Sequence, residues 1–406
     1  MSSDQGWGPT QRHVVAASYL GWMLDAFDFF LLVFVFGRVA GDFNTDVRNV
    51  TFAVALTLAM RPIGALLFGR LADRYGRRPA LMASVLAYSV MEFASAFAPS
   101  LPVFLGLRAL YGIAMGGEWG VGASLAFESI PTRSRGLVSG VLQAGYPSGY
   151  LLAAIVYGVL IDRIGWRGMF MLGAAPALLL LYIRSKVPES EVWKAGAERN
   201  RQSLWQGMSG HWALAGYAVL LMTAFNFFSH GTQDLYPHFL QTQRGFASGT
   251  VATIAIVYNV GAICGGIVIG TFSSCLGRRR MIALAATLSL VVLPFWAFSV
   301  GAVPIAIAAF VMQFMVQGAW GIVPVHLNEL SPPAIRATFP GFVYQLGNLI
   351  ASVNAPMQTI IAEHRGDSSH PDFAFALSLV CAIVAVCLMV LALLGPERRN
   401  VRFDTQ

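Results

Sequence analysis

Six polar or ionisable side chains lie within nine residues of a strongly apolar stretch: Asn226, Ser229, His230, Thr232, Gln233 and Asp234. Ionisable groups inside a membrane cost about 2.5–3.5 kcal/mol on insertion scales, so they usually face a protein interior or a water-filled path. His230 and Asp234 are four residues apart on one helix face, where an imidazole and an acid can pass a proton, and His238 continues that face. Helix packing alone requires fewer polar groups, so the pattern predicts a binding site within the membrane.

The composition is that of an integral membrane protein. Hydrophobic residues make up 56% of the 406-residue chain and charged residues 12%, against about 25% charged residues in soluble proteins. The apolar segments predict an all-α protein with twelve spans near residues 13–36, 50–72, 79–98, 102–127, 135–160, 167–185, 212–241, 248–275, 280–299, 302–327, 337–362 and 372–394.

Basic residues alternate with the predicted topology and do not gather on one surface, which argues against nucleic-acid binding. Nineteen Lys or Arg fall on the side of both predicted termini, Arg199 and Arg201 among them, and six fall opposite. The positive-inside rule then places both termini in the cytoplasm. The low lysine content favours a bacterium, and so the cytoplasmic (inner) membrane. We expect a monomer that is surrounded by lipid and has no cofactor. We also expect no metal site, because the four cysteines show no metal-ligand spacing.

Four motifs recur at a constant distance of 201 residues. Gly76-Arg77-Arg78 recurs at residues 277–279, Gly117-Glu118-Trp119-Gly120 recurs in altered form at residues 318–321, Glu128 recurs as Glu329, and Arg135 as Arg336. The offset also matches Asp25 with Asn226 and Asp28 with Ser229, which we expect to face each other across a central cavity. Repeated halves are common in secondary transporters. We predict a six-helix bundle over residues 1–185, a linker over 186–210 and a second six-helix bundle over 211–406.

The segment from Gly69 to Arg78 resembles the loop signature that the major facilitator superfamily carries between its second and third helices. Residues 226–234 look like the hallmark of its lactate and pyruvate proton symporters of the Jen carboxylate permease type, which are grouped with sialate symporters. Support is spread over nearly the whole chain, at residues 22–30, 61–64, 116–120, 143–146 and 344–348. The resemblance implies two pseudo-symmetric bundles that work by alternating access. His238 stands where the hallmark usually has threonine, so substrate preference or pH response is expected to differ.

Arg61 is the first candidate for binding a substrate carboxylate. It falls in the middle of a predicted span, where a guanidinium can bind a carboxylate through two hydrogen bonds, and the resemblance also implies a substrate role for it. The alternative is an internal salt bridge with Asp25 or Asp28. The remaining predicted substrate contacts are the polar groups of residues 226–233 and five side chains of the fifth and eleventh spans: Gln143, Tyr146, Tyr344, Gln345 and Asn348.

Six ionisable side chains are candidates for proton coupling: Asp25, Asp28, Glu118, His230, Asp234 and Arg108. Burial raises the pKa of a carboxyl group, and a nearby arginine lowers it. An anion that binds Arg61 would therefore leave a neighbouring carboxyl group free to take up a proton. Glu118 has Ala319 as its counterpart in the repeat, and it can equally bridge two helices. Arg108 resembles the fourth-helix signature of proton-linked members, and a structural arginine near the outer surface is the alternative.

Charged residues at the predicted cytoplasmic ends suggest a gate. Asp73 lies near Arg77 at a helix end, and Glu128 and Glu329 each precede a short loop that bears Arg135 or Arg336. We predict the salt bridges Glu128–Arg135 and Glu329–Arg336, because surface pairs worth about 0–1 kcal/mol suit a contact that opens in every cycle.

Other functions fit the sequence less well. The fifth span lacks the Gly-Pro-rich signature of drug antiporters, and Pro188-Glu189-Ser190 gives only faint support for a sugar porter. A larger acid such as sialate or an aromatic acid stays open, and so does a receptor that binds a metabolite without moving it. No nucleophile with a base and no phosphate loop stands out, so we do not expect an enzyme.

Overall fold

The computed structural model describes residues 7–196, 204–366, 371–399 and 401–403, and every regular element in these ranges is helical. The N-terminal half holds α1 (Pro9–Asp42), α2 (Val47–Tyr75), α3 (Arg77–Ser95), α4 (Leu101–Gly116), α5 (Glu118–Ser129), α6 (Arg135–Leu172) and α7 (Ala177–Lys186). The C-terminal half holds α10 (Trp212–Gln233), α11 (Tyr236–Thr242), α12 (Ser248–Leu276), α13 (Arg278–Phe298), α14 (Ala302–Trp320), α15 (Val323–Leu330), α16 (Thr338–Ala351), α17 (Asn354–Arg365) and α18 (Phe373–Leu394).

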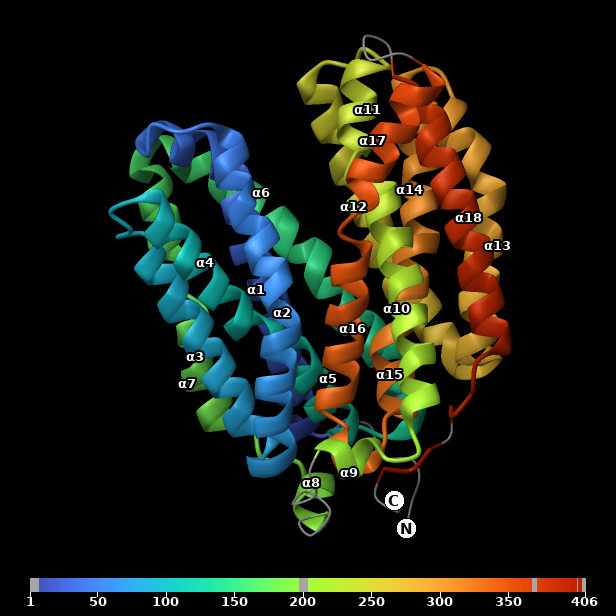
Figure 1. The fold of residues 1–406 in the computed structure, drawn as a ribbon. Helices are drawn as coiled ribbons and strands as arrows, with labels where there is room; N and C mark the ends of the chain where they lie inside the picture. Colours follow the sequence, from blue (N-terminus) through green and yellow to red (C-terminus); the bar gives the residue numbers. More distant parts are fainter. Residues whose placement is uncertain (1–6, 197–203, 367–370, 400, 404–406) are drawn as a thin grey trace.

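Short helices connect these elements. The described parts of the predicted linker contain α8 (Glu191–Ala195) and α9 (Leu204–Met208), whereas residues 197–203, with Arg199 and Arg201, lie outside the described residues. The 3-10 turns η1 (Thr132–Ser134) and η3 (Pro333–Ile335) precede α6 and α16. The two halves lie side by side and diverge toward one end (Figure 1). We call the other end, where α1 begins and α18 ends, the terminus face.

Eight helical segments among the described residues are long and apolar enough to cross a membrane by themselves. The predicted spans 102–127 and 337–362 are instead built from two helices each, α4–α5 and α16–α17. The predicted boundary between the fifth and sixth spans, between residues 160 and 167, is confirmed: the helical run labelled α6 continues to Leu172 but is kinked at Gly165, where φ is 65°. Glycine reaches that conformation without a steric cost, so the chain can turn at this position.

The predicted span 212–241 is confirmed as a candidate membrane span, Trp212–Thr242, but it consists of two helices. α10 ends at Gln233, and Pro237 lies in the first turn of α11, where a missing N–H does no harm. The prediction that His238 continues the face of His230 and Asp234 was therefore wrong. His238 is exposed, and its ring packs edge-on against Phe373 with 5.1 Å between the ring centroids.

Close backbone packing joins α2 to α4. A β-carbon on Gly64 would lie 1.8 Å from the carbonyl oxygen of Ile113, and one on Gly116 would lie 2.1 Å from that of Arg61. We expect Gly64→Ala to lower the melting temperature of the purified protein, because overpacking against rigid backbone costs about 1–3 kcal/mol or more.

Gly106→Ala is the matched control for this seam, because Gly106 lies on α4 with nothing within 4 Å of its β-carbon position. Alanine is favoured over glycine by about 1 kcal/mol inside a helix, so this variant should melt at or above the wild-type temperature. Equal melting temperatures for the two variants would contradict the packing argument.

Candidate functional site

A cavity of about 440 Å³ lies between the two halves, and most of the predicted substrate contacts line it. Nine of the eleven predicted residues are on its wall: Arg61, Gln143, Tyr146, Asn226, Ser229, His230, Gln233, Tyr344 and Asn348. Thr232 and Gln345 are not on the wall. Both are buried in the C-terminal half, where the Thr232 hydroxyl donates to the carbonyl oxygen of Phe228.

Several cavity residues were not predicted from the sequence. Gln317 donates from Nε2 to Ser229 Oγ at 2.9 Å, and Tyr150, Tyr258, Asn259 and Trp320 also line the cavity. Gln317 immediately precedes the repeated Gly318-Ala319-Trp320-Gly321 motif. The repeat gives no signal for it, because its counterpart at the offset of 201 residues is Gly116.

Arg61 brings a positive charge to the cavity wall. Its side chain is 3% exposed. One guanidinium nitrogen donates to Met115 Sδ at 2.7 Å, and the guanidinium carbon lies 5.2 Å from the centre of the Phe29 ring. The alternative salt bridge with Asp25 or Asp28 is absent, and no described acid lies within ion-pair distance of Arg61. The guanidinium is therefore available to an anion.

His230 on α10 faces two hydrogen-bond acceptors. Its Nδ1 lies 3.2 Å from Asp234 Oδ1, and its Nε2 lies 3.1 Å from Asn348 Oδ1 on α16. An imidazole that donates to both acceptors carries two protons and a positive charge. When the ring is neutral, the Asn348 amide can turn its NH₂ group toward the unprotonated nitrogen. The arrangement can hold and release one proton.

Asp25 and Asp28 do not face the cavity, which corrects the expectation that they lie opposite Asn226 and Ser229. Both are fully buried, and their four carboxyl oxygens have no hydrogen-bond partner. The cavity side of α1 is instead formed by Trp22, Phe29 and Phe30. Asp28 lies on the far side of α1 from these residues, whereas Asp25, three residues after Trp22 and four before Phe29, lies at the edge of their face and is covered by the wall.

Arg108 is paired with an acid that the sequence analysis missed. Its guanidinium lies 2.7 Å from Glu92 Oε2 on α3, and neither side chain is exposed. Arg108 also donates to Ser95 Oγ at 2.8 Å and lies 4.2 Å from the centre of the Tyr111 ring. These contacts are the kind that the structural alternative requires, and they do not test the predicted place of Arg108 near the outer surface.

Asp28 and Glu92 meet beside Gly173, at the end of α6. A β-carbon built on Gly173 would lie 2.6 Å from Glu92 Cγ and 3.1 Å from Asp28 Oδ1. The two acids thus share one small space beside Arg108. Within the described part of the chain, Arg108 is the one arginine in ion-pair contact with this couple, so the interior favours a proton on one of the two carboxyl groups.

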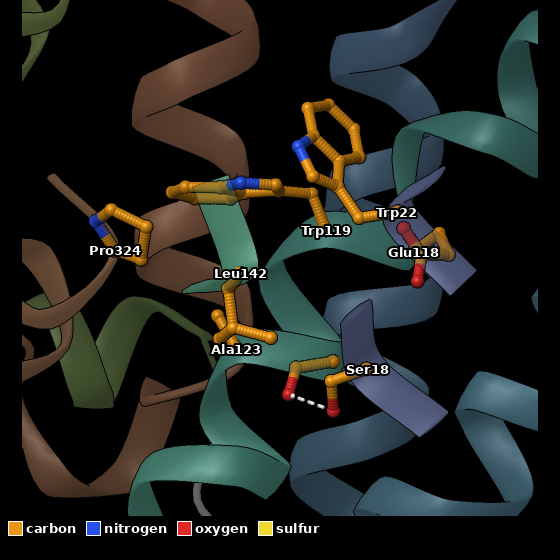
Figure 2. Close-up of a pocket in the computed structure, with 8 residues that line it drawn as sticks. Ser18, Trp22, Glu118, Trp119, Ala123, Leu142 and Pro324 are labelled. Carbon is orange, nitrogen blue, oxygen red and sulfur yellow. Dashed lines mark hydrogen bonds between the residues drawn. The ribbon is translucent and has the colours of Figure 1, made fainter. Parts of the chain in front are cut away.

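Glu118 begins α5 and lies beside a small cavity of about 10 Å³, which is about the volume that one water molecule needs. Ser18, Trp22, Trp119 and Leu142 surround this cavity (Figure 2). Both Glu118 oxygens are buried without a hydrogen-bond partner. A β-carbon on Gly21 would lie 2.3 Å from Glu118 Oε1, so glycine leaves the space that this acid occupies.

The terminus face carries the same ion pair in each half. Arg77 lies 2.9 Å from Glu128, and at the repeat offset Arg278 lies 3.1 Å from Glu329. Each glutamate thus pairs with the arginine of a Gly-Arg-Arg turn, whereas the sequence predicted Arg135 and Arg336. The 3-10 turns between the helices direct these two arginines elsewhere.

Asp73 joins the two halves. Its carboxylate lies 2.9 Å from Arg77 Nη1 and accepts hydrogen bonds from the opposite half: from the backbone N–H groups of Ala337 and Thr338 at 2.9 and 3.1 Å, and from the Thr338 hydroxyl at 2.6 Å. Charge-assisted bonds of this kind are about twice as strong as neutral ones. The contact holds α2 against the start of α16.

Two further acids accept hydrogen bonds at the starts of α3 and α13. Glu189 accepts from the N–H of Arg77 at 2.9 Å, and Glu397 accepts from the N–H groups of Arg278 and Arg279, both at 3.1 Å. Burial raises the pKa of Glu189, while the N–H bonds that it accepts oppose this.

Phe403 lies between the halves at the same face. Its ring is 3% exposed, and the guanidinium carbons of Arg135 and Arg336 lie 3.7 and 4.2 Å from its centre. Arg135 also donates to the carbonyl oxygen of Val401 at 2.7 Å. The predicted gate arginines therefore hold the segment that follows α18.

The sequence pattern of the Major Facilitator Superfamily matches residues 19–247. The chain belongs to this superfamily. The pattern described as "Sugar (and other) transporter" matches residues 209–397. A major facilitator protein solved as a proton:xylose symporter, XylE, has the same fold, with a TM-score of 0.77, 17% identity and 96% of each chain covered. The superfamily fold of two six-helix bundles is thus present here.

Two curated relatives of this superfamily member are similar over almost its whole length. The "Carboxylic acid transporter protein homolog" of Saccharomyces cerevisiae is 28% identical, over 94% of this chain and 67% of the relative. The "Sialic acid transporter NanX" of Escherichia coli is 26% identical, over 95% of this chain and 94% of the relative. The superfamily member described here thus aligns with transporters along nearly all of its spans.

Proposed function

We propose that this chain is a proton-coupled symporter of small monocarboxylates, of the lactate and pyruvate type, which works by alternating access in a bacterial cytoplasmic membrane with both termini cytoplasmic. The observation that carries the proposal is the unpaired Arg61 guanidinium on the wall of the central cavity. A buried cation without a counter-ion is costly, and a substrate carboxylate would supply the missing charge. The names of the relatives, which transport carboxylic and sialic acids, support an organic acid as the cargo.

The proposed proton path has two parts. His230, Asp234 and Asn348 lie on the cavity wall and can exchange a proton with water there. Asp25, Asp28, Glu92 and Glu118 are buried behind the wall, with Arg108 as the ion-pair partner of Glu92. A carboxylate and a proton that move together carry no net charge, so the pH gradient drives uptake. Arg108 acts in this proposal through the acids beside it.

The test is uptake of radiolabelled L-lactate into proteoliposomes, with and without an inward proton gradient. We expect the gradient to stimulate uptake and an uncoupler to abolish the stimulation. Liposomes without protein and an excess of unlabelled pyruvate are the controls. If lactate is not taken up at any pH, the monocarboxylate assignment fails.

A larger organic acid is the second candidate, because a cavity of about 440 Å³ falls within the range of about 300–1,000 Å³ typical for ligands larger than lactate. Labelled sialate and an aromatic acid, tested in the same liposomes, separate the two candidates. Binding of one of these acids without any accumulation would instead indicate the receptor function.

We further propose that Asp73 closes the gate at the terminus face together with the Arg77–Glu128 and Arg278–Glu329 pairs, with Arg135 and Arg336 acting through Phe403. Asp73→Asn should shift the protein toward the state that is open at this face. It weakens three hydrogen bonds to the opposite half, and bonds to a charged group contribute about 1.5–3 kcal/mol each.

Spin labels at the equivalent positions Tyr75 and Leu276, both more than half exposed, would measure this opening in a background without the four native cysteines. The longer distance should gain population in Asp73→Asn. Asp372→Asn, which alters the N-cap of α18, should leave the distribution as in the wild type. An unchanged distribution in Asp73→Asn would remove Asp73 from the gate.

A further inference from the structure

A broad basic groove opens at the terminus face, between the ends of α12 and α18 and the start of α13. Four arginines line it: Arg279, Arg280, Arg398 and Arg399. Glu397 is the one acid on its described wall, and it is engaged by the N–H groups of Arg278 and Arg279. The groove therefore has an excess of positive charge that lies outside the central cavity and the gate.

Two of these arginines donate hydrogen bonds to backbone carbonyl groups, and the other two do not. Arg279 donates to the carbonyl oxygen of Ala392, and Arg399 donates to that of Cys275, both at 2.8 Å. Arg280 and Arg398 are exposed and form no hydrogen bond or ion pair with a described side chain or carbonyl. Their guanidinium groups are free to bind an anion that enters the groove.

The repeat shows that the fold does not require this charge. At the offset of 201 residues, Arg280 corresponds to Pro79. Glu189 and Glu397 occupy equivalent places, since each accepts from the first N–H of α3 or α13. The residues after them are Ser190 and Glu191 in the first half but Arg398 and Arg399 in the second. The fold therefore does not require an arginine at positions 280 and 398, and the basic residues of the N-terminal half at this face lie at other positions, at the ends of α2 and α7: Arg74, Arg184 and Lys186.

The groove also borders an apolar surface. Leu276 and Leu393, which are 52% and 47% exposed, line it, and Phe272 and Leu394 lie exposed nearby at the ends of α12 and α18. A free anion would need only the arginines. A lipid would place its phosphate among the arginines and its acyl chains along these side chains, and basic pockets between helices on the cytoplasmic side bind lipid headgroups in this way.

We propose that this groove is a binding site for an anionic phospholipid of the cytoplasmic leaflet. The phosphate of the lipid bridges Arg280 and Arg398, and its chains cover Leu276 and Leu393. The site does not depend on which substrate the central cavity binds.

The test is a lipid titration of the purified full-length protein in lipid-free detergent, read by native mass spectrometry. Dioleoyl phosphatidylglycerol should bind at least tenfold more tightly than dioleoyl phosphatidylcholine. Arg280→Gln/Arg398→Gln should weaken phosphatidylglycerol binding about 30-fold, which equals about 2 kcal/mol at ~1.4 kcal/mol per factor of ten. Because both residues are exposed, the variant should melt as the wild type does without lipid.

Arg12→Gln/Arg184→Gln is the matched control, since it removes two exposed arginines from the same face outside the groove. It should bind phosphatidylglycerol within twofold of the wild type. Equal losses in both double variants would reveal a diffuse surface charge and overturn the site. Tight binding of phosphatidylcholine, or displacement of the lipid by millimolar inorganic phosphate, would overturn the choice of an anionic lipid.

Cys275 provides a second readout, because it is exposed and lies in the groove. In nanodiscs, a water-soluble maleimide should modify it several-fold more slowly with phosphatidylglycerol than with phosphatidylcholine. The difference should disappear in Arg280→Gln/Arg398→Gln. Equal rates in the two lipids for the wild type would contradict the proposal.

Discussion

Arg61→Ala is expected to reduce gradient-driven uptake about 30-fold or more while the protein still folds. Removing one partner of a buried, hydrogen-bonded charge pair costs about 2–5 kcal/mol, and this is the loss that a bound carboxylate would suffer. The folded state should tolerate the change, because Arg61 forms no ion pair with a described residue. Initial uptake rates in proteoliposomes, at equal amounts of monodisperse protein, measure the effect.

Arg61→Lys refines this experiment, because lysine keeps the charge but cannot form two parallel bonds to a carboxylate. It should retain part of the uptake with a raised KM. Arg12→Ala, at an exposed arginine of α1, should behave as the wild type. Normal uptake by Arg61→Ala would show that the anion binds elsewhere on the cavity wall.

Arg108→Met is expected to destabilise the protein by about 3–5 kcal/mol, because it leaves the buried Glu92 without its ion-pair partner. Met fills much of the space among Tyr111, Phe104 and Phe170, whose rings surround the guanidinium. The loss should therefore arise mainly from the unpaired acid. Thermal melting in detergent measures it.

The double variant Arg108→Met/Glu92→Gln separates stability from coupling. Removing both charges should restore most of the melting temperature, since replacing a whole buried pair by uncharged groups is often neutral. If the pair also positions Asp28 for proton binding, the restored protein should exchange lactate across the membrane but fail to accumulate it against a gradient. Full accumulation by the double variant would make the pair purely structural. A double variant as unstable as Arg108→Met would contradict the ion-pair account.

The sequence predicted the polar wall of the cavity better than the buried acids. Asn226, Ser229 and His230 follow a helical spacing that marks one face, and Arg61 is conspicuous in the middle of an apolar span. Both signals are local, and both groups line the cavity. The direction of Asp25 and Asp28 depends instead on which face of α1 meets the other helices. The repeat offset matches Phe29 with His230, and both line the cavity, but it does not carry over to the aspartates, because Asn226 and Ser229 line the cavity while Asp25 and Asp28 do not.

Other features depend on long-range contacts, which the spacing of residues along the sequence does not reveal. Glu92 is a single acid in α3, and only the fold brings Arg108 to it. The partners of Glu128 and Glu329 were misassigned because the nearest arginine along the chain was chosen, whereas the Gly-Arg-Arg turns lie closer in space. Pro237 should have indicated the end of α10, since proline starts α11 there.

The ring of Phe403 holds the segment after α18 against both halves, because it contacts Arg135 of one half and Arg336 of the other. A rocking motion that parts Arg135 from Arg336 cannot keep both guanidinium groups on one ring, whose centre lies 3.7 and 4.2 Å from them. At least one cation–π contact, worth about 0.5–2 kcal/mol, must then break in each turnover. In the proposed alternating-access cycle, the segment around Phe403 would therefore change its contacts each time the halves move apart at this face. An environment-sensitive fluorophore placed there would brighten and dim with each passage of cargo.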